Sequence, residues 1–374
     1  MRRDSQPGPR DKMKALYTHF LRPMLFQLDP ETAHRFSLRA LSCLRPVARG
    51  LPSWSETNDS RLTQNLWNIP FSNPFGLAGG FDKNAECADL WRLFGFSFVE
   101  VGTVTPQPQA GNPRPRLFRY PDQRAIVNRM GFNNDGAEKI AARLAALHAK
   151  GRLQGTVVGI SLGKQKDTPP HEIDLVIRDY VTVLETLHPY GDYFAVNVSS
   201  PNTPELRSLQ QQEVLAPLLR ALLIRLEVKA LQEGRRRKPL CVKLAPDLSD
   251  EQLQEALQVI TNLKLDGIIA ANTTNQTGAL ESGGLSGLPL RQRSTEMIRR
   301  IAQLTQGAIP ILGCGGVFTW EDAVEKLEAG AWLIQLYTGF VYEGPTVVRD
   351  LAWGLLAYLE RRALSSLSAL RPYS

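Results

Sequence analysis

The sequence contains few of the residues that build metal sites or disulfide frameworks. Its 374 residues include only four cysteines and five histidines. The cysteines lie far apart, form no C-x-x-C pair and have no histidine at ligand spacing; they are Cys43, Cys87, Cys241 and Cys314. This spacing argues against a bound metal and against disulfide bonds, and it favours a reducing compartment.

Long hydrophobic runs are also absent. No uninterrupted apolar stretch approaches the ~18 residues of a membrane-spanning helix. The first segment, "MRRDSQPGPRDK", is polar, and no hydrophobic signal core follows it. Lys and Arg outnumber Asp and Glu by 44 to 37, but they are scattered apart from "RRRK" at 235–238, which carries no nucleic-acid-binding motif. We therefore expect a cytosolic chain without a transmembrane helix, a signal peptide or a nucleic-acid partner.

From residue 75 onward, short apolar segments alternate with segments of helical periodicity. The apolar segments are Phe75–Ala78, Phe98–Val101, Val157–Ile160, Phe194–Val198, Leu240–Leu244, Gly267–Ala271, Ile309–Leu312 and Leu333–Leu336. Helical segments include "DGAEKIAARLAALHAK" and "SDEQLQEALQVITNLK", the second with Ser249 as its cap. Eight such units predict an α/β fold, a (β/α)8 TIM barrel over residues 75–365. A doubly wound sheet is the alternative, but it usually has fewer strands.

Polar or glycine-rich clusters follow all eight predicted strands, and this pattern indicates an active site. The clusters are "GGFDK", "GTVTP", "SLGK", "NVSSPN", "KLAPD", "NTT", "GCGG" and "LYTG". In a barrel they meet at the carboxyl ends of the strands. The last two clusters offer backbone amides to a phosphate group. Lys243 should point inward, where it needs an anion such as a reduced flavin.

Residues 13–50 stand apart and predict two short amphipathic helices. The second begins with Asp29 as its cap and Pro30 in its first turn, and its apolar face would comprise Ala33, Phe36, Ala40, Leu41 and Leu44. Positive charge dominates the region, which therefore either lies on an anionic membrane surface or packs against the barrel. We expect a disordered tail at 1–12, a connecting segment at 51–74 and a C-terminal tail at 366–374.

Seven motifs together carry a resemblance to a known family. They are "NPFGLAGGFDKNAE", "VGTVTPQPQAGNPRPRLFR", "NRMGFNNDG", "NVSSPNTPELRSLQ", "VKLAPDLS", "GGLSGLPL" and "LIQLYTGFVYEGP". In number and order they resemble dihydroorotate dehydrogenase, and more narrowly its quinone-dependent, membrane-associated class (class 2). The match runs from about residue 28 to about residue 348. The resemblance implies the barrel already inferred, with the N-terminal helix pair as a quinone entrance.

The resemblance also implies the roles of individual residues. It places FMN against Ala78, Gly79, Gly80, Lys83, Thr103, Ser161, Asn197, Lys243, Ala271, Gly287, Gly316, Tyr337 and Thr338. It places dihydroorotate against Lys83, Asn128, Arg129, Met130, Gly131, Phe132, Asn197, Asn202, Asn272 and Thr273. Ser200 would be the catalytic base, and His34 and Arg119 would lie near the quinone passage. No metal is implied.

Three features depart from the family pattern. Ser161 stands where the family usually has asparagine, Ala271 stands where it usually has threonine, and the loop from Thr274 to Gly283 is short. Losing two polar groups that face the flavin would weaken FMN binding by about 1 kcal/mol each. At Ser161, a water molecule can fill the space left by the shorter side chain.

The implied activity is the oxidation of (S)-dihydroorotate to orotate in pyrimidine biosynthesis. Ser200 would remove the C5 proton while the hydride passes to FMN, and a membrane quinone would reoxidise the flavin. A serine base and a helical extension favour quinone over fumarate or NAD, and they predict a peripheral protein on the cytoplasmic side of the cell membrane. The alternatives are a flavin- and membrane-binding protein that has lost catalysis, or a flavoenzyme for another pyrimidine. The complete set of polar site residues argues against both.

Overall fold

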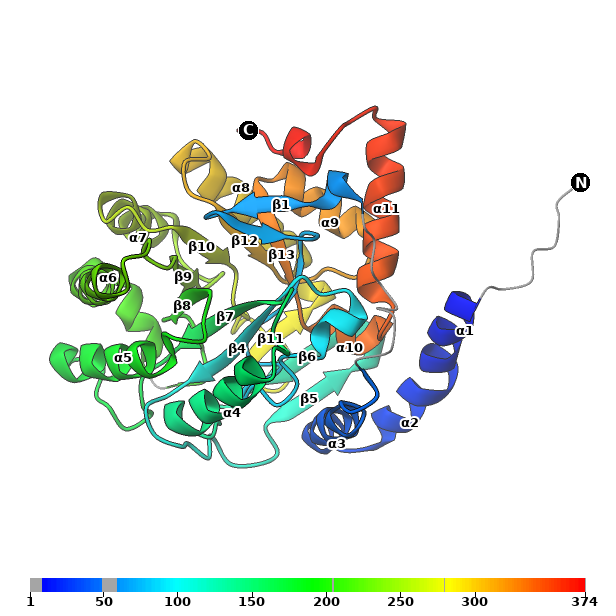
Figure 1. Ribbon diagram of the computed structural model, residues 1–374, viewed down its shortest axis with the longest axis horizontal. Coiled ribbons are helices and arrows are strands. Elements are labelled where there is room, and N and C mark those ends of the chain that lie inside the picture. The colour runs from blue at the N-terminus through cyan, green and yellow to red at the C-terminus, as the bar shows by residue number, and fades with distance from the viewer. Residues whose placement is uncertain (1–8, 49–58, 204, 279, 374) are drawn as a thin grey trace, which may run out of the picture.

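A closed barrel of eight parallel strands forms the centre of the molecule (Figure 1). The computed structural model describes residues 9–48, 59–203, 205–278 and 280–373. The barrel strands are β3 (Phe75–Leu77), β4 (Phe98–Val104), β7 (Val157–Leu162), β8 (Tyr193–Asn197), β9 (Leu240–Leu244), β10 (Gly267–Ala270), β12 (Ile311–Cys314) and β13 (Ala331–Leu336). β13 pairs with β3 and closes the sheet. The predicted TIM barrel is confirmed, and the doubly wound alternative is wrong.

Helices surround the barrel and bury the outward faces of its strands (Figure 1). They are α4 (Ala137–Ala149), α5 (Ile173–Leu187), α6 (Gln212–Glu233), α7 (Asp250–Asn262), α8 (Arg291–Thr305), α9 (Trp320–Glu328), α10 (Thr338–Glu343) and α11 (Val347–Arg361). As predicted, Ser249 caps α7, and its hydroxyl accepts a hydrogen bond from the Gln252 amide. The capping box explains why the chain turns into a helix at this point.

The barrel interior is apolar near the amino ends of the strands. Side chains alternate between the two faces of a strand, and Phe98, Tyr193 and Cys241 pack together inside the barrel. A hairpin of β1 (Gln64–Leu66) and β2 (Ile69–Phe71) adds Leu66 and Phe71 to this cluster. The hairpin therefore covers the apolar cluster at the amino end of the barrel.

A polar group of buried side chains forms the next layer. The layer consists of Glu100 on β4, Lys243 on β9 and Gln335 on β13. Each comes two positions after an inward-facing residue of its strand, so each also faces inward. Gln335 Nε2 donates to Glu100 Oε2 at 2.7 Å, and Lys243 Nζ lies 3.9 Å from Glu100 Oε1. The inward orientation predicted for Lys243 is therefore confirmed.

A second, smaller sheet was not predicted from the sequence. It consists of β5 (Leu117–Tyr120), β6 (Ala125–Asn128) and β11 (Gly284–Gly287), which pair antiparallel in the order β11, β6, β5. Its outer strands come from segments more than 150 residues apart. Leu117, Ile126, Asn128 and Gly287 all line the cavity at the mouth of the barrel. The small sheet therefore forms one wall of the candidate site.

The N-terminal helices pack against the barrel. They are α1 (Pro9–Leu16), a π-helical turn (Tyr17–Leu21), α2 (Arg22–Gln27) and α3 (Pro30–Cys43). Asp29 caps α3 as predicted, because its Oδ1 accepts from the Thr32 amide at 2.9 Å. The first helix begins at Pro9, so residues 9–12 are helical and not part of a disordered tail; residues 1–8 lie outside the described residues.

The apolar face predicted for α3 is only partly correct. Ala33 and Leu38 are buried against the body of the protein, whereas Phe36 is 60% exposed. Ala40 and Leu44 are exposed as well. The helices bury one apolar face and present another to the outside, whose larger members are Leu16, Phe20, Leu21, Met24, Leu28, Phe36, Leu44 and Val47. We call this group the outer apolar surface.

The remaining segments contain short regular elements. The 3-10 turns are Ser60–Leu62, Trp91–Phe94, Pro121–Gln123, Leu206–Gln210, Leu288–Leu290 and Leu367–Leu370. Leu367 and Leu370 are buried, so the C-terminal segment packs on the barrel. Within the parts of the chain that the structure describes, no helix has both the length and the apolar character needed to cross a bilayer.

Candidate active site

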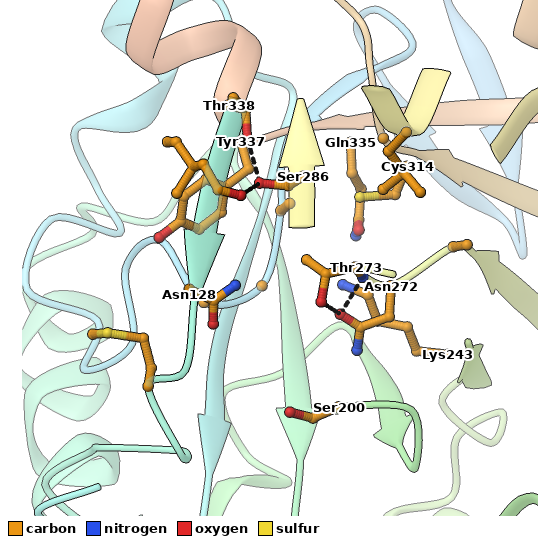
Figure 2. A pocket seen from close by; sticks show the side chains of 18 of the residues that line it. Asn128, Ser200, Lys243, Asn272, Thr273, Ser286, Cys314, Gln335, Tyr337 and Thr338 are labelled. Atoms are coloured by element: carbon orange, nitrogen blue, oxygen red, sulfur yellow. Dashed lines mark hydrogen bonds between the residues drawn. The ribbon is translucent and has the colours of Figure 1, made fainter. Parts of the chain in front are cut away.

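Most of the predicted site residues meet in one cavity at the carboxyl ends of the barrel strands (Figure 2). The cavity has a volume of about 1040 Å³. Of the predicted residues it is lined by Ala78, Gly79, Gly80, Lys83, Thr103, Asn128, Met130, Gly131, Phe132, Asn197, Ser200, Asn202, Lys243, Ala271, Asn272, Thr273, Gly287, Gly316, Tyr337 and Thr338. The fold thus brings together residues from seven of the eight strand ends.

Two of the residues predicted to contact FMN or dihydroorotate, Ser161 and Arg129, do not line this cavity. The Ser161 hydroxyl is buried and lies 2.9 Å from Thr103 Oγ1, so Ser161 contacts the site only through Thr103. Arg129 points away: its Nε donates to the Pro115 carbonyl at 3.2 Å, and its guanidinium lies over the Phe118 ring. The structure therefore does not bring Arg129 into this cavity.

Ten further residues line the cavity. Four of them belong to the clusters "GCGG" and "LYTG", which the sequence analysis expects at a phosphate site: Cys314, Gly315, Leu336 and Gly339. The six that sequence reasoning missed are Leu117, Ile126, Ser286, Leu290, Val317 and Gln335. Ser286 belongs to the quoted motif "GGLSGLPL", and its Oγ lies 2.8 Å from Thr338 Oγ1. Gln335 could have been found from the two-residue alternation of β13. Leu117 and Ile126 could not have been found from the sequence, because they belong to the small sheet that was not predicted.

One end of the cavity is suited to a phosphate group. Gly287 and Gly316 have φ values of 100° and 72°, which glycine adopts without strain. A Cβ on Gly316 would lie 2.3 Å from Arg291 Cα, at the start of α8. The hydroxyls of Ser286 and Thr338 lie 2.8 Å apart (Figure 2), and a Cβ on Gly287 would lie 3.0 Å from Thr338 Cγ2. Backbone amides and hydroxyls of this kind are the donors that bind phosphate in barrels.

The opposite end carries Ser200 and a chain of amides. Ser200 is 7% exposed, and its Oγ accepts from the Asn202 amide at 3.2 Å. Asn202 Nδ2 in turn donates to Asn128 Oδ1 at 3.0 Å. Among the described residues, no histidine forms a hydrogen bond with Ser200. The arrangement therefore does not support a Ser-His nucleophile, whereas a hydroxyl held by a backbone amide can accept a proton.

Ser199 is buried and, unlike Ser200, faces away from the cavity. It does not line the cavity. Its hydroxyl accepts from Asn272 Nδ2 at 2.9 Å and lies 3.3 Å from Asn197 Oδ1. Asn197 Nδ2 donates to Thr103 Oγ1 at 2.7 Å. The Ser199 hydroxyl therefore links two amide side chains that face the cavity and limits their rotation.

Lys83 contributes a cation beside the glycines that follow β3. Its Nζ donates to the Gly80 carbonyl at 2.6 Å. Burial lowers the pKa of Lys83 to about 8. Lys83 therefore remains mostly charged at neutral pH and favours an anionic group in the cavity.

A second cavity of about 990 Å³ lies between the barrel and the N-terminal helices. His34 and Arg119, which the sequence placed near a quinone passage, both line it. Burial, and next the charge of Lys83, lowers the pKa of His34 to about 3, so this ring is neutral at physiological pH. Its Nε2 lies 2.9 Å from the Phe81 carbonyl. The walls are otherwise mostly apolar.

Comparison with known proteins identifies the family. The family model for dihydroorotate dehydrogenase matches residues 61–359. The chain belongs to the dihydroorotate dehydrogenase family. The predicted family resemblance is thus confirmed.

Relatives within this dehydrogenase family align with nearly the whole chain. A dihydroorotate dehydrogenase (quinone) of Thermosynechococcus vestitus is 48% identical over 366 residues, covering 91% of this chain and 96% of the relative. A dihydroorotate dehydrogenase (quinone) of Acaryochloris marina is 46% identical, covering 95% of this chain and 98% of the relative. The crystal structure of DHODH in complex with ferulenol from Eimeria tenella has a TM-score of 0.82, with 36% identity over 91% of this chain and 94% of that chain.

Two of the three departures that the sequence analysis names, Ser161 and Ala271, differ in their surroundings. Ala271 lines the cavity directly, so its methyl group leaves one position of the wall without a polar group. Ser161 is already hydrogen-bonded to Thr103, which lines the cavity in its place. The missing polar group at Ala271 therefore affects the cavity wall more directly than the one at Ser161.

Proposed function

We propose that this protein oxidises (S)-dihydroorotate to orotate with FMN as hydride acceptor and a quinone as final electron acceptor, in pyrimidine biosynthesis. One observation supports this best. The polar cavity and the apolar cavity share Leu117, Ile126 and Tyr337 in their walls. A substrate and a lipophilic quinone can therefore reach opposite sides of one cofactor.

The residues present fit FMN. The glycines at 287 and 316 and the Thr338 hydroxyl form a cradle that would hold its phosphate. Gln335 Oε1 is buried without a hydrogen-bond partner among the described residues, at the floor where the ring would lie. When bound, FMN supplies a two-electron acceptor for the hydride. Lys243 would stabilise negative charge at the ring.

The chain's own residues perform the remaining steps. Asn128, Asn202 and Asn272 would hold the planar ring and carboxylate of dihydroorotate, with Lys83 nearby. Ser200 would take the C5 proton as it passes its own hydroxyl proton to a water molecule, and the Asn202 amide would stabilise the negative charge that develops on its Oγ. Ser200 and its neighbours are buried, so little water competes for the developing charge.

The outer apolar surface supports attachment to a membrane surface, on the cytoplasmic side of the cell membrane. Arg35 and Arg39 are exposed on the same helix as Phe36. Apolar side chains flanked by arginines favour an anionic bilayer surface. The helices would then present the second cavity to quinone dissolved in the membrane.

A visible spectrum tests the proposal and separates it from its alternatives. The purified protein with added FMN should be yellow and should bleach without oxygen when dihydroorotate is added. A hydrophobic quinone should restore the colour. Bound FMN that no pyrimidine bleaches would instead favour a protein that has lost catalysis. Bleaching by a dihydropyrimidine without the carboxylate, but not by dihydroorotate, would favour an enzyme for another pyrimidine.

A further inference from the structure

Glu100 is a buried carboxylate to which the proposed reaction assigns no role. It lies on β4 and is completely buried in the barrel interior. Its Oε2 accepts hydrogen bonds from Gln335 Nε2 at 2.7 Å and from the Tyr193 hydroxyl at 3.2 Å. Among the described residues, its Oε1 has no hydrogen-bond partner. A carboxylate in this position is costly unless a cation compensates for it.

Lys243 is the cation that faces it. Lys243 Nζ lies 3.9 Å from Glu100 Oε1, and the side chain of Lys243 is only 6% exposed. Three titratable groups near the pair are neutral. Burial raises the pKa of the thiols Cys241 and Cys314 above the usual range, and burial followed by the charge of Glu100 does the same for Tyr193. The two charges therefore balance each other inside the barrel.

The pair lies directly below the proposed cofactor site. Lys243 and Gln335 both line the cavity (Figure 2). A Cβ added to Gly79, in the loop expected to hold FMN, would lie 2.4 Å from Glu100 Oε1. The carboxylate is thus in contact with the backbone of that loop and, through Lys243 and Gln335, close to the cavity floor.

We propose that Glu100 is a positioning residue that holds Lys243 under the flavin and offsets its charge. A lone lysine at this place would strongly favour the negative charge of a reduced flavin and raise its reduction potential. The carboxylate lowers that potential, so that electrons leave the flavin for the quinone more readily. This role rests on the proposed binding of FMN at this site.

The test is a double-mutant cycle on the reduction potential of bound FMN at pH 6. Glu100→Gln should raise the potential, because Lys243 keeps its charge while its counter-charge is gone. Lys243→Met should lower it. The double variant should return close to the native value, since the two charges are removed together. A tenfold change in the affinity ratio of reduced and oxidised flavin corresponds to about 30 mV for a two-electron couple, and we expect at least that for Glu100→Gln.

A control variant and a replacement variant accompany the test. Tyr193→Phe removes one hydrogen bond to Glu100 but no charge, and it should shift the potential much less than Glu100→Gln. If Glu100→Gln does not fold, Glu100→Asp withdraws the charge from Lys243 by one methylene and should raise the potential in the same direction. An unchanged potential in both Glu100 variants, or a double variant whose potential stays as low as that of Lys243→Met, would overturn the proposal.

The measurement also separates this proposal from the proposed function. Reduction by xanthine oxidase beside a reference dye needs neither dihydroorotate nor quinone. Failure of the native protein to bind FMN would contradict the proposed cofactor. A native protein that binds FMN but does not oxidise dihydroorotate would contradict the proposed reaction and still allow the cycle to be measured.

Discussion

The backbone amide of Asn202 donates a hydrogen bond of 3.2 Å to the hydroxyl oxygen of Ser200. The bond closes a tight turn directly after β8, in which Ser200 faces the cavity and Ser199 faces the protein interior. A serine in this geometry has no histidine to activate it. It needs only to accept one proton from carbon, and the amide lowers the cost of charge on its oxygen.

Ser200→Ala should retain FMN and bind orotate, yet reduce its flavin more slowly by roughly 10²–10⁴, the usual contribution of a positioned base. In the native protein, the rate should rise with pH, because the deprotonated hydroxyl is the stronger base. Stopped-flow bleaching of the flavin by dihydroorotate measures both effects. Near-normal reduction in Ser200→Ala would show that the base lies elsewhere.

Ser199→Ala is the matched comparison for Ser200. Its hydroxyl links Asn197 and Asn272, so its removal should loosen two amides that face the substrate. We expect orotate binding to weaken by about 1 kcal/mol, the typical contribution of one hydrogen bond. Flavin reduction at saturating dihydroorotate should fall far less than in Ser200→Ala. Equal losses of rate in the two variants would contradict the separate roles.

Ala271→Thr should tighten FMN binding by about 1 kcal/mol, because it adds a hydroxyl to the cavity wall. Ser161→Asn should retain FMN at least as well as the native chain, but its gain should be smaller, since Thr103 already binds Ser161. Quenching of FMN fluorescence gives both dissociation constants. Weaker binding in Ala271→Thr would show that the site has no room for the hydroxyl.

Deletion of residues 1–50 should spare flavin reduction by dihydroorotate but severely reduce turnover with a hydrophobic quinone. The helices form much of the wall of the second cavity. The deletion should also lower thermal stability, because buried Arg116 loses its partner Glu31, 2.7 Å away. Stopped-flow reduction and steady-state quinone turnover separate the two half-reactions. Unchanged quinone turnover would mean that the helices only pack against the barrel.

Point substitutions test membrane attachment without this loss of stability. Phe20→Ser and Phe36→Ser change side chains that are 65% and 60% exposed, so folding should be unaffected. Both should weaken binding to anionic vesicles in a flotation assay. Ile224→Ser, a similarly exposed position on α6, is the control and should bind as the native protein does. Equal losses in all three would indicate a general surface effect.

Lys326→Met should stabilise the fold at pH 7 by about 3 kcal/mol. This figure is the shift in the pKa of Lys326 converted into free energy. Burial lowers the pKa of Lys326 to about 8, from an ordinary 10.5. Below pH 8, folding therefore bears the full cost of a buried charge. Between pH 8 and 10.5, the unfolded chain keeps a proton that the folded chain has released. The stability of the native protein therefore rises with pH, and the stabilisation by Lys326→Met disappears.

The substitution leaves no hydroxyl without a partner. Ser294 and Thr295, which bind Lys326 in the native protein, also donate to backbone carbonyls. Urea unfolding at pH 7 and pH 10 checks the sign; a gain that persists at pH 10 would contradict the electrostatic cause.

Much of the fold and site was determined by the sequence alone, because its signals are local. Eight apolar segments have the length and spacing of buried parallel strands. Asp29 and Ser249 mark helix starts through hydrogen bonds within one turn. The site residues follow strand ends directly, and parallel strands in a barrel bring those ends together whatever the details of packing.

Only the tertiary structure decided which side chains face each other across long stretches of sequence. β11 pairs with β6 across more than 150 residues, and no local pattern predicts that pairing. Arg129 turns away from the site because the Pro115 carbonyl and the Phe118 ring offer it partners there. Phe36 is exposed, although the spacing of apolar residues placed it on the same helix face as Ala33, which is buried. Local periodicity shows that a side chain is apolar, but the neighbours that cover it, like the approach of Glu100 to Lys243, exist only once the barrel has closed.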